Sequence, residues 1–279
     1  MDSSHILSVV TFIYAFAAIL YIASLIFKRE LPGVIATVVT IFGVLGNAAG
    51  IGLRWFESHK IGIGHVPLSN LYESLVFFAL TIAVLYLVIE RKYQNRVVGA
   101  FVTPLAFLAM AYASLSPNIS DRIMPLLPAL KSNWLIAHVM SCFIGYAAFA
   151  LSFGVSIMYL AKIRSEQKEH SFLDRFPEVS VLNELNYQLI IFGFLFLTIG
   201  IITGAVWANS AWGRYWGWDP KETWSLITWF VYATLLHVRI TRNWDGKRIA
   251  YLSMLGFLAV MVTYFGVNYL PGLHSYGSR

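Results

Sequence analysis

The chain has 279 residues, of which 58% are hydrophobic and only 12% are charged. Ordinary soluble domains carry about 25% charged residues, so this composition excludes a soluble protein and indicates a membrane protein surrounded by lipid. The formal net charge of +6 does not indicate nucleic-acid binding, because the basic residues cluster at the ends of apolar runs, as membrane topology requires.

Eight apolar runs are each long enough to cross a bilayer, which takes roughly 20 residues of helix. A span that faces lipid must satisfy its own backbone hydrogen bonds, so each run is predicted to be a helix. The sequence therefore predicts an all-α, polytopic transmembrane bundle that forms one integral membrane domain over residues 1–279. The predicted spans are 6–27, 33–53, 71–89, 97–115, 134–161, 186–208, 222–240 and 248–270.

Lysine and arginine are distributed unequally between the two sets of connections, with thirteen in one set and seven in the other. The positive-inside rule assigns the richer set to the cytoplasm. Both termini are then predicted to lie on the outer side, which is periplasmic or lumenal. The outer connections would be 54–70, 116–133, 209–221 and the tail 271–279.

Three helix starts can be predicted from capping residues. Asn70 fits an N-cap with the Glu73 carboxylate at the third helical position, and Asn133 is expected to cap the fifth helix. The run 219–222, Asp-Pro-Lys-Glu, fits a capping box with proline at the first helical position. Asp219 has a second interpretation, in which its carboxylate orients a tryptophan N–H of the preceding loop.

The outer loop over 209–224 is rich in tryptophan, and with the residues next to it holds five of the nine tryptophans of the chain. An aromatic belt at the membrane interface would explain this composition. Glycines between the rings favour tight turns and close approach, and Trp216 and Trp218 would share a face if that stretch were extended. The five tryptophans are Trp207, Trp212, Trp216, Trp218 and Trp224.

Such an aromatic platform could stack on a large, flat, apolar ligand. Arg214 and Lys221 flank the platform and could pair with carboxylates of that ligand. A planar macrocycle with two propionates matches this set of groups, so the loop raises a haem hypothesis. The single cysteine, Cys142, lies in an apolar run, and without a Cys-x-x-Cys-His motif the chain does not itself carry covalently attached haem.

Three histidines are candidate ligands of haem iron. His138 is about one turn into the fifth span, roughly 6–8 Å from its outer end, and His274 follows the eighth span. Both are expected at the depth of the tryptophans, where they either clamp iron from its two faces or are unrelated interfacial histidines. His237 is expected about 22 Å from the outer end of its helix, where it either marks a functional site or bonds to a neighbouring helix. His59 and His65 of an outer loop have no clear role.

At this point the residues resemble a known family. The run 212–222, Trp-Gly-Arg-Tyr-Trp-Gly-Trp-Asp-Pro-Lys-Glu, resembles the WWD signature of haem-handling proteins. The runs 67–75 and 272–277 resemble its CcsA/ResC-type members, which serve system II cytochrome c biogenesis. The resemblance implies that haem is exported, presented at the outer face and ligated to the Cys-x-x-Cys-His motif of apocytochrome c. The chain would be part of a holocytochrome c synthase, a thioether-forming haem lyase, in a bacterial cytoplasmic membrane or a thylakoid membrane.

The resemblance also implies roles for single residues. His138 and His274 match the outer histidines that ligate haem iron, and His237 matches an intramembrane histidine that shares a second haem with a CcsB/ResB-type partner. Haem b would be the substrate, and no residue need act as a nucleophile or general base, since the addition chemistry belongs to the haem and the thiols. The implied haem-binding set is His138, His274, His237, Trp212, Trp216, Trp218, Asp219, Arg214 and Trp224.

Two alternatives compete with this interpretation, one within haem handling and one of another functional class. A CcmC-like protein, which delivers haem to a haem chaperone, typically has six spans, whereas eight are predicted here. A membrane transporter that does not bind haem would be expected to show repeated, broken helices. The sequence shows no internal repeat, which favours the CcsA/ResC-type interpretation.

Overall fold

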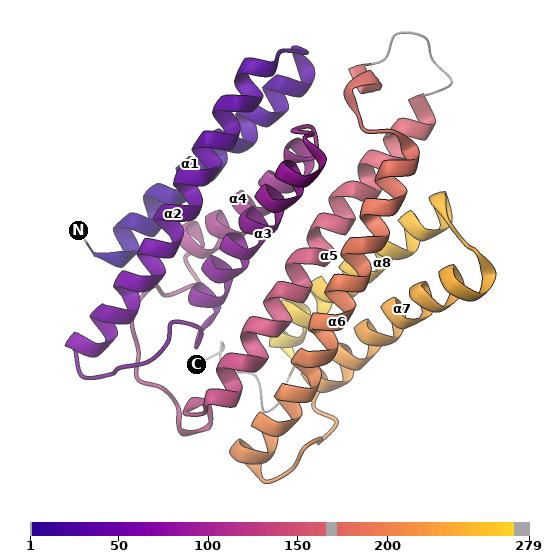
Figure 1. Cartoon of the computed structure of the whole chain (residues 1–279). Coiled ribbons are helices and arrows are strands. Elements are labelled where there is room, and N and C mark those ends of the chain that lie inside the picture. The colour runs from indigo at the N-terminus through magenta and orange to yellow at the C-terminus, as the bar shows by residue number, and fades with distance from the viewer. Residues whose placement is uncertain (1, 166–171, 271–279) are drawn as a thin grey trace. The chain divides into compact units, whose positions relative to one another are not determined.

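The computed structural model describes residues 2–165 and 172–270, and within these ranges every regular element is helical (Figure 1). The predicted all-α architecture is therefore confirmed. Each of the eight predicted spans corresponds to one α-helix. The α-helices are α1 (Ser3–Ile26), α2 (Glu30–Lys60), α3 (Leu71–Tyr93), α4 (Gly99–Leu115), α5 (Asn133–Ser165), α6 (Val179–Trp212), α7 (Pro220–Arg242) and α8 (Gly246–Tyr264). Three short 3-10 helices are η1 (Pro128–Leu130), η2 (Phe172–Arg175) and η3 (Gly266–Tyr269).

The helix ends differ from the predicted spans in a systematic way. Helices α2, α5 and α6 extend beyond the apolar runs, and α6 continues to Trp212 although its span was predicted to end at residue 208. Apolar composition marks the part that lipid can cover, whereas the helical hydrogen bonds continue to the next cap. Helix α8 instead ends early, at Tyr264, and the chain tightens into η3.

Six of these helices are long and apolar enough to cross a membrane, in the part of the chain that the structure describes. They are α1, α2, α3, α5, α6 and α8. Helix α4 is apolar but has only 17 residues. Helix α7 is less apolar, because Glu222, His237 and Arg239 lie within its 23 residues. The chain is thus a helical membrane protein, and the crossing of the bilayer by α4 and α7 stays a prediction.

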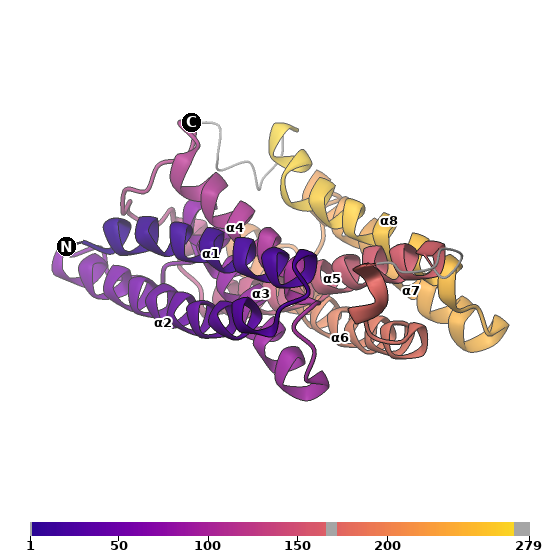
Figure 2. The ribbon, with the colours of Figure 1, turned by 90° about the horizontal axis from the view of Figure 1, so that it is seen from above.

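The chain folds into two compact units, which are described separately below. Unit 1 comprises Met1–Pro125 and Ile157–Leu182, and unit 2 comprises Leu126–Ser156 and Asn183–Arg279. In unit 1, α1 packs against α2 and α4, and α3 packs against the same two helices, so the four form a bundle. Figures 1 and 2 both show α1 and α2 side by side.

Two buried carboxylates join the α1–α2 hairpin to α3. Near one end of α3, Glu73 accepts a hydrogen bond of 2.8 Å from Arg54 of α2, and both side chains are almost fully buried. Near the other end, Glu90 accepts hydrogen bonds from Tyr21 of α1 at 2.8 Å and Thr37 of α2 at 2.5 Å. Buried charges persist where they are paired and hydrogen-bonded, so these contacts give the hairpin a defined place on α3.

The predicted cap of α3 is confirmed, and that of α5 is wrong. The Asn70 side chain accepts a hydrogen bond of 2.9 Å from the Glu73 backbone N–H. Asn133 is the first residue of α5, and the Ser132 hydroxyl accepts the hydrogen bond from the Trp134 N–H, at 3.3 Å. The prediction failed because serine and asparagine are both good N-caps, and the sequence does not show which of two neighbours takes the position.

Unit 2 is organised around α5, which contacts the other three long helices. The Ser152 hydroxyl bonds to Asn186 of α6 at 2.5 Å and to Ser253 of α8 at 2.6 Å. The Phe149 ring stacks on Tyr232 of α7, with centroids 3.5 Å apart and planes at 7°. These contacts position the N-terminal end of α5, which carries His138, against α6.

Candidate haem-binding site at one end of unit 2

His138 of α5 is held by a backbone carbonyl of α6. Its Nδ1 lies 2.7 Å from the Gly200 oxygen, and its ring stacks on Trp207 with centroids 5.9 Å apart and planes at 16°. A carbonyl oxygen only accepts, so Nδ1 carries the proton and donates it. In the tautomer with its proton on Nδ1, the ring lone pair is on Nε2. A histidine that ligates a metal usually donates its other N–H in this way, so the donor chemistry of His138 fits an axial ligand.

Two glycines of α6 make this close approach possible. A Cβ added at Gly204 would lie 2.6 Å from His138 Nδ1, and one added at Gly200 would lie 2.6 Å from Cys142 Sγ. Cys142, one turn after His138, has its sulfur 3.6 Å from the same Nδ1. The two glycines have the Gly-x-x-x-Gly spacing that lets transmembrane helices pack closely. Sequence reasoning missed their role, although this spacing was a usable signal.

Trp207 and Trp212 lie in α6. Trp207 is 2% exposed and donates from Nε1 to the Ala129 carbonyl at 2.8 Å. It packs with Leu130 and Leu135, and its ring meets that of Trp212 edge to face at 4.9 Å. The connection between α6 and α7 is therefore shorter than the predicted 209–224 loop. It comprises residues 213–219, and Trp207 belongs to the wall that supports His138.

Trp216 and Trp218 were predicted to share a face if their stretch were extended, and that condition is not met. Trp218 has φ +55°, so the chain turns at that residue and is not extended. The two rings are perpendicular, with centroids 5.7 Å apart and planes at 89°. Trp218 is 70% exposed, whereas Trp216 is half-buried. Within the described residues, the buried Nε1–H of Trp216 has no hydrogen-bond acceptor.

The start of α7 explains the turn at Trp218. The Asp219 side chain accepts from the Lys221 N–H at 2.9 Å, and Glu222 accepts from the Asp219 N–H at 3.1 Å, which completes the predicted capping box. The same Glu222 oxygen accepts from the Gly217 N–H at 2.7 Å. Asp219 is therefore a helix cap, and Glu222 ties the cap to the tryptophan connection.

The remaining predicted site residues of this connection have separate surroundings. Arg214 is exposed and covers Gly217, where an added Cβ would lie 2.7 Å from the Arg214 Cζ. Trp224 is half-buried in the first turns of α7, and its carbonyl accepts a hydrogen bond of 3.1 Å from Thr263 of α8. The contact between Trp224 and Thr263 thus joins the start of α7, which follows the connection, to α8.

The other histidines differ sharply from His138. His237 lies on an exposed face of α7, where its backbone carbonyl accepts from Thr241. His274 lies outside the described residues. His65, whose role sequence reasoning left open, is buried in unit 1, with its ring nitrogens 3.0 Å from the Val66 oxygen and 3.2 Å from the Met124 oxygen. His65 thus ties two connections together.

Comparison with known proteins identifies what the chain resembles. The family model described as "Cytochrome C assembly protein" matches residues 68–274, which include α3 to α8 and the tryptophan connection. A protein named "Cytochrome c biogenesis protein CcsA" from Guillardia theta is 44% identical over 257 residues, 85% of this chain and 84% of that protein. The protein of that name from Porphyra purpurea is 40% identical, over 94% of this chain and 93% of that protein. The one from Synechococcus sp. strain CC9902 is 41% identical, over 88% of this chain and 87% of that protein.

A solved structure shares the fold. The structure of "Cytochrome c Heme Lyase CcmF" matches 95% of this chain with a TM-score of 0.71 and 16% identity. This chain spans about half of it, since 47% of that chain is covered. At this level of identity the likeness concerns the arrangement of the helices alone.

Proposed function

Because the chain belongs to the cytochrome c assembly family, we propose that it presents haem b at the outer face of its membrane for ligation to apocytochrome c. The observation that carries the proposal is the 2.7 Å contact between His138 Nδ1 and the Gly200 oxygen, which directs Nε2 away as a metal ligand. The sequence similarity to proteins named CcsA favours ligation over delivery of haem to a chaperone.

We assign the axial positions of the haem iron to His138 and His274. The assignment of His274 rests on its sequence position after α8 and on the family resemblance. Two strong imidazole ligands restrain the iron from oxygen chemistry. The wall formed by Trp207, with its indole held by Ala129, keeps the His138 ring from rotating.

The α6–α7 connection would orient the macrocycle. The Trp216 Nε1–H needs an acceptor. A haem propionate would accept this hydrogen bond, and its charge would also pair with Arg214. Trp218, Trp212 and Trp224 supply apolar ring surface around that connection. Positioning is the main contribution of the chain, because correct orientation alone accelerates a reaction between bound groups.

Haem supplies two vinyl groups to which the cysteine thiols of apocytochrome c add. In each addition a C–S bond forms, the S–H bond breaks, and its hydrogen goes to the other vinyl carbon. The histidine of the Cys-x-x-Cys-His motif then replaces one of the two axial histidines of this chain. These steps require no side chain of this protein as a nucleophile or a general base.

His237 would belong to a second haem station nearer the cytoplasm. Its exposed place on α7 suits a ligand that a CcsB/ResB-type partner completes from the opposite side. An exposed histidine in a lipid-facing helix is costly, which supports cover by such a partner. The proposed topology has eight spans with both termini outside, in a bacterial cytoplasmic or thylakoid membrane.

The proposal is tested by His138→Ala and His274→Ala in the full chain with its partner. Each change should lower the haem retained after purification and the yield of a reporter cytochrome c. His59→Ala is the matched control, since His59 is an exposed histidine in the last turn of α2, outside unit 2, and its Nδ1 lies 2.9 Å from the Trp55 oxygen. Unchanged haem content and maturation in both test variants would refute the assignment.

A further inference from the structure

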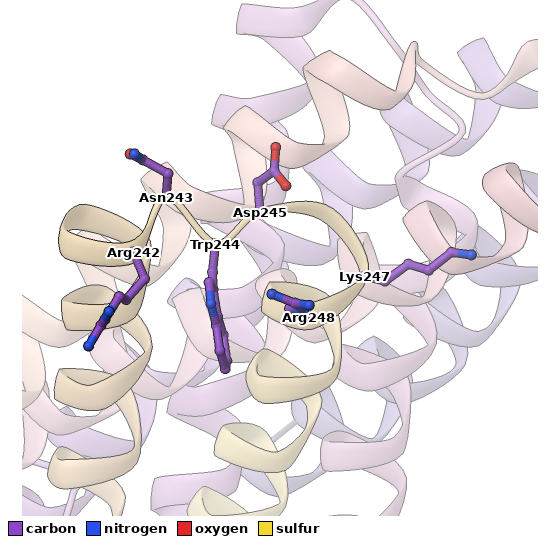
Figure 3. A pocket seen from close by; sticks show the side chains of 6 residues that line it. All are labelled: Arg242, Asn243, Trp244, Asp245, Lys247 and Arg248. Carbon is purple, nitrogen blue, oxygen red and sulfur yellow. The ribbon is translucent and has the colours of Figure 1, made fainter.

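The turn between α7 and α8 contains a pocket of about 290 Å³, lined by three cations and a tryptophan. Figure 3 shows Arg242, Trp244 and Arg248 extending to the side of the turn on which the two helices lie, while the Asp245 carboxylate points the opposite way. Two of the three basic groups and the indole therefore lie on the helix side of the turn, whereas Lys247 extends sideways from it. The pocket residues are Arg242, Asn243, Trp244, Asp245, Lys247 and Arg248.

The backbone of this turn is firmly held. Asn243 adopts a left-handed conformation with φ +48°, and the Trp244 N–H bonds to the Val238 carbonyl at 3.3 Å. Asn183 of α6 accepts from both the Gly246 N–H and the Arg239 guanidinium, each at 3.3 Å. The pocket is thus built into the end of the helical hairpin.

The two arginines of the pocket differ in their pairing from Arg96 and Arg175 of unit 1. Arg96 lies 3.3 Å from Glu90, and Arg175 pairs with Glu30. Across residues 2–165 and 172–270, neither Arg242 nor Arg248 forms an ion pair, and Arg248 instead lies over the Trp244 ring at 5.0 Å. The positive-inside rule accounts for basic residues on this side, and the additional feature here is that three of them line one pocket together with a tryptophan.

The first turn of α8 also favours a bound anion. Asp245 occupies the N-cap position, but its side chain makes no cap hydrogen bond. Lys247 and Arg248 follow it in the first turn, where positive charge opposes the helix dipole. An anion held by the arginines would neutralise them and would stand near the remaining N–H groups of the first turn, since the Gly246 N–H is already bonded to Asn183.

We propose that this pocket binds the phosphate of an anionic phospholipid headgroup. Arg242 and Arg248 would hold the phosphate, and Trp244 would lie at the headgroup level, where indole rings are favoured. A lipid is favoured over a dissolved anion because both guanidinium groups and the indole extend toward the helices and the Asp245 carboxylate points away from them. The proposal rests on the proposed topology, in which the turn contacts the negatively charged cytoplasmic leaflet.

The test compares lipids on the purified full chain in a neutral detergent at constant ionic strength. Short-chain phosphatidylglycerol should bind about thirtyfold more tightly than phosphatidylcholine, because the two arginines near an anionic headgroup contribute about 1 kcal/mol each and every 1.4 kcal/mol corresponds to about tenfold in affinity. The double variant R242Q/R248Q should lose that preference. The matched control R91Q/R164Q removes the same charge from exposed positions outside the pocket and should keep it.

Two further measurements separate the alternatives. Thermal unfolding without added lipid checks that both double variants remain folded, and haem content should stay at the wild-type level in each. A retained preference in R242Q/R248Q, or an equal loss in R91Q/R164Q, would overturn the proposal. Displacement of phosphatidylglycerol by an equal concentration of inorganic phosphate would also overturn it, because the site would then recognise a dissolved anion.

Discussion

Replacing Gly204 by alanine on α6 is expected to weaken haem binding through His138. The new Cβ would lie 2.6 Å from Nδ1 and 2.7 Å from Cε1 of the His138 ring. Ordinary contacts begin near 3.5 Å, so the ring must retreat by roughly 0.9 Å. A retreat along the bond to Gly200, now 2.7 Å long, would stretch it to roughly 3.6 Å, beyond hydrogen-bond length.

The size of the effect follows from the lost support of the ligand. Removing the partner that orients a metal-bound histidine typically weakens metal binding about 10- to 100-fold. The overpacked contact should also cost about 1–3 kcal/mol of stability. We expect haem to transfer from Gly204→Ala to an excess of apomyoglobin about 10- to 100-fold faster than from the wild-type protein, followed by absorption in the Soret band.

A matched control separates ligand positioning from general loosening. At Gly256, an added Cβ would lie 2.6 Å from the Tyr232 ring, in the same unit and with no histidine involved. Gly256→Ala should lower the unfolding temperature to a similar degree and keep the wild-type rate of haem transfer. Equal acceleration in both variants, or a wild-type rate in Gly204→Ala, would refute the reasoning.

Three further predictions concern other parts of the chain. Asp219→Ala should lower stability by about 1 kcal/mol through the lost cap, measured by thermal unfolding, with haem retained; haem loss equal to that of His138→Ala would contradict the cap role. Glu73→Leu should lower the free energy of unfolding by about 3–5 kcal/mol, because it leaves Arg54 buried and unpaired, and adding Arg54→Leu should restore most of that stability. Chemical denaturation measures both variants, and a double variant no more stable than Glu73→Leu would contradict this. His237→Ala should remove only the haem absorbance that appears when the partner is present. Loss of haem absorbance from the chain purified without the partner would argue against a shared site.

Much of the helical architecture followed from local properties of the sequence. Eight apolar runs of sufficient length predicted the eight helices, because a lipid-facing backbone has few other ways to satisfy its hydrogen bonds. The capping box of α7 was predicted from four consecutive residues, 219–222, and its hydrogen bonds are present. Such features span one helical turn, so the sequence contains nearly all the information that they need.

The site itself depended on contacts between distant residues. The sequence singled out His138 but not the Gly200 carbonyl, 62 residues away, that orients it. It also placed Trp207 and Trp212 beside or within a loop, whereas α6 extends through both residues. It allowed Trp216 and Trp218 to share a face, whereas the turn at Trp218 separates their rings. Where a helix stops and which backbone group meets a side chain depend on the packing of α5 against α6. That packing depends on the shapes of both helices together, so the tertiary structure alone decided how His138 is held.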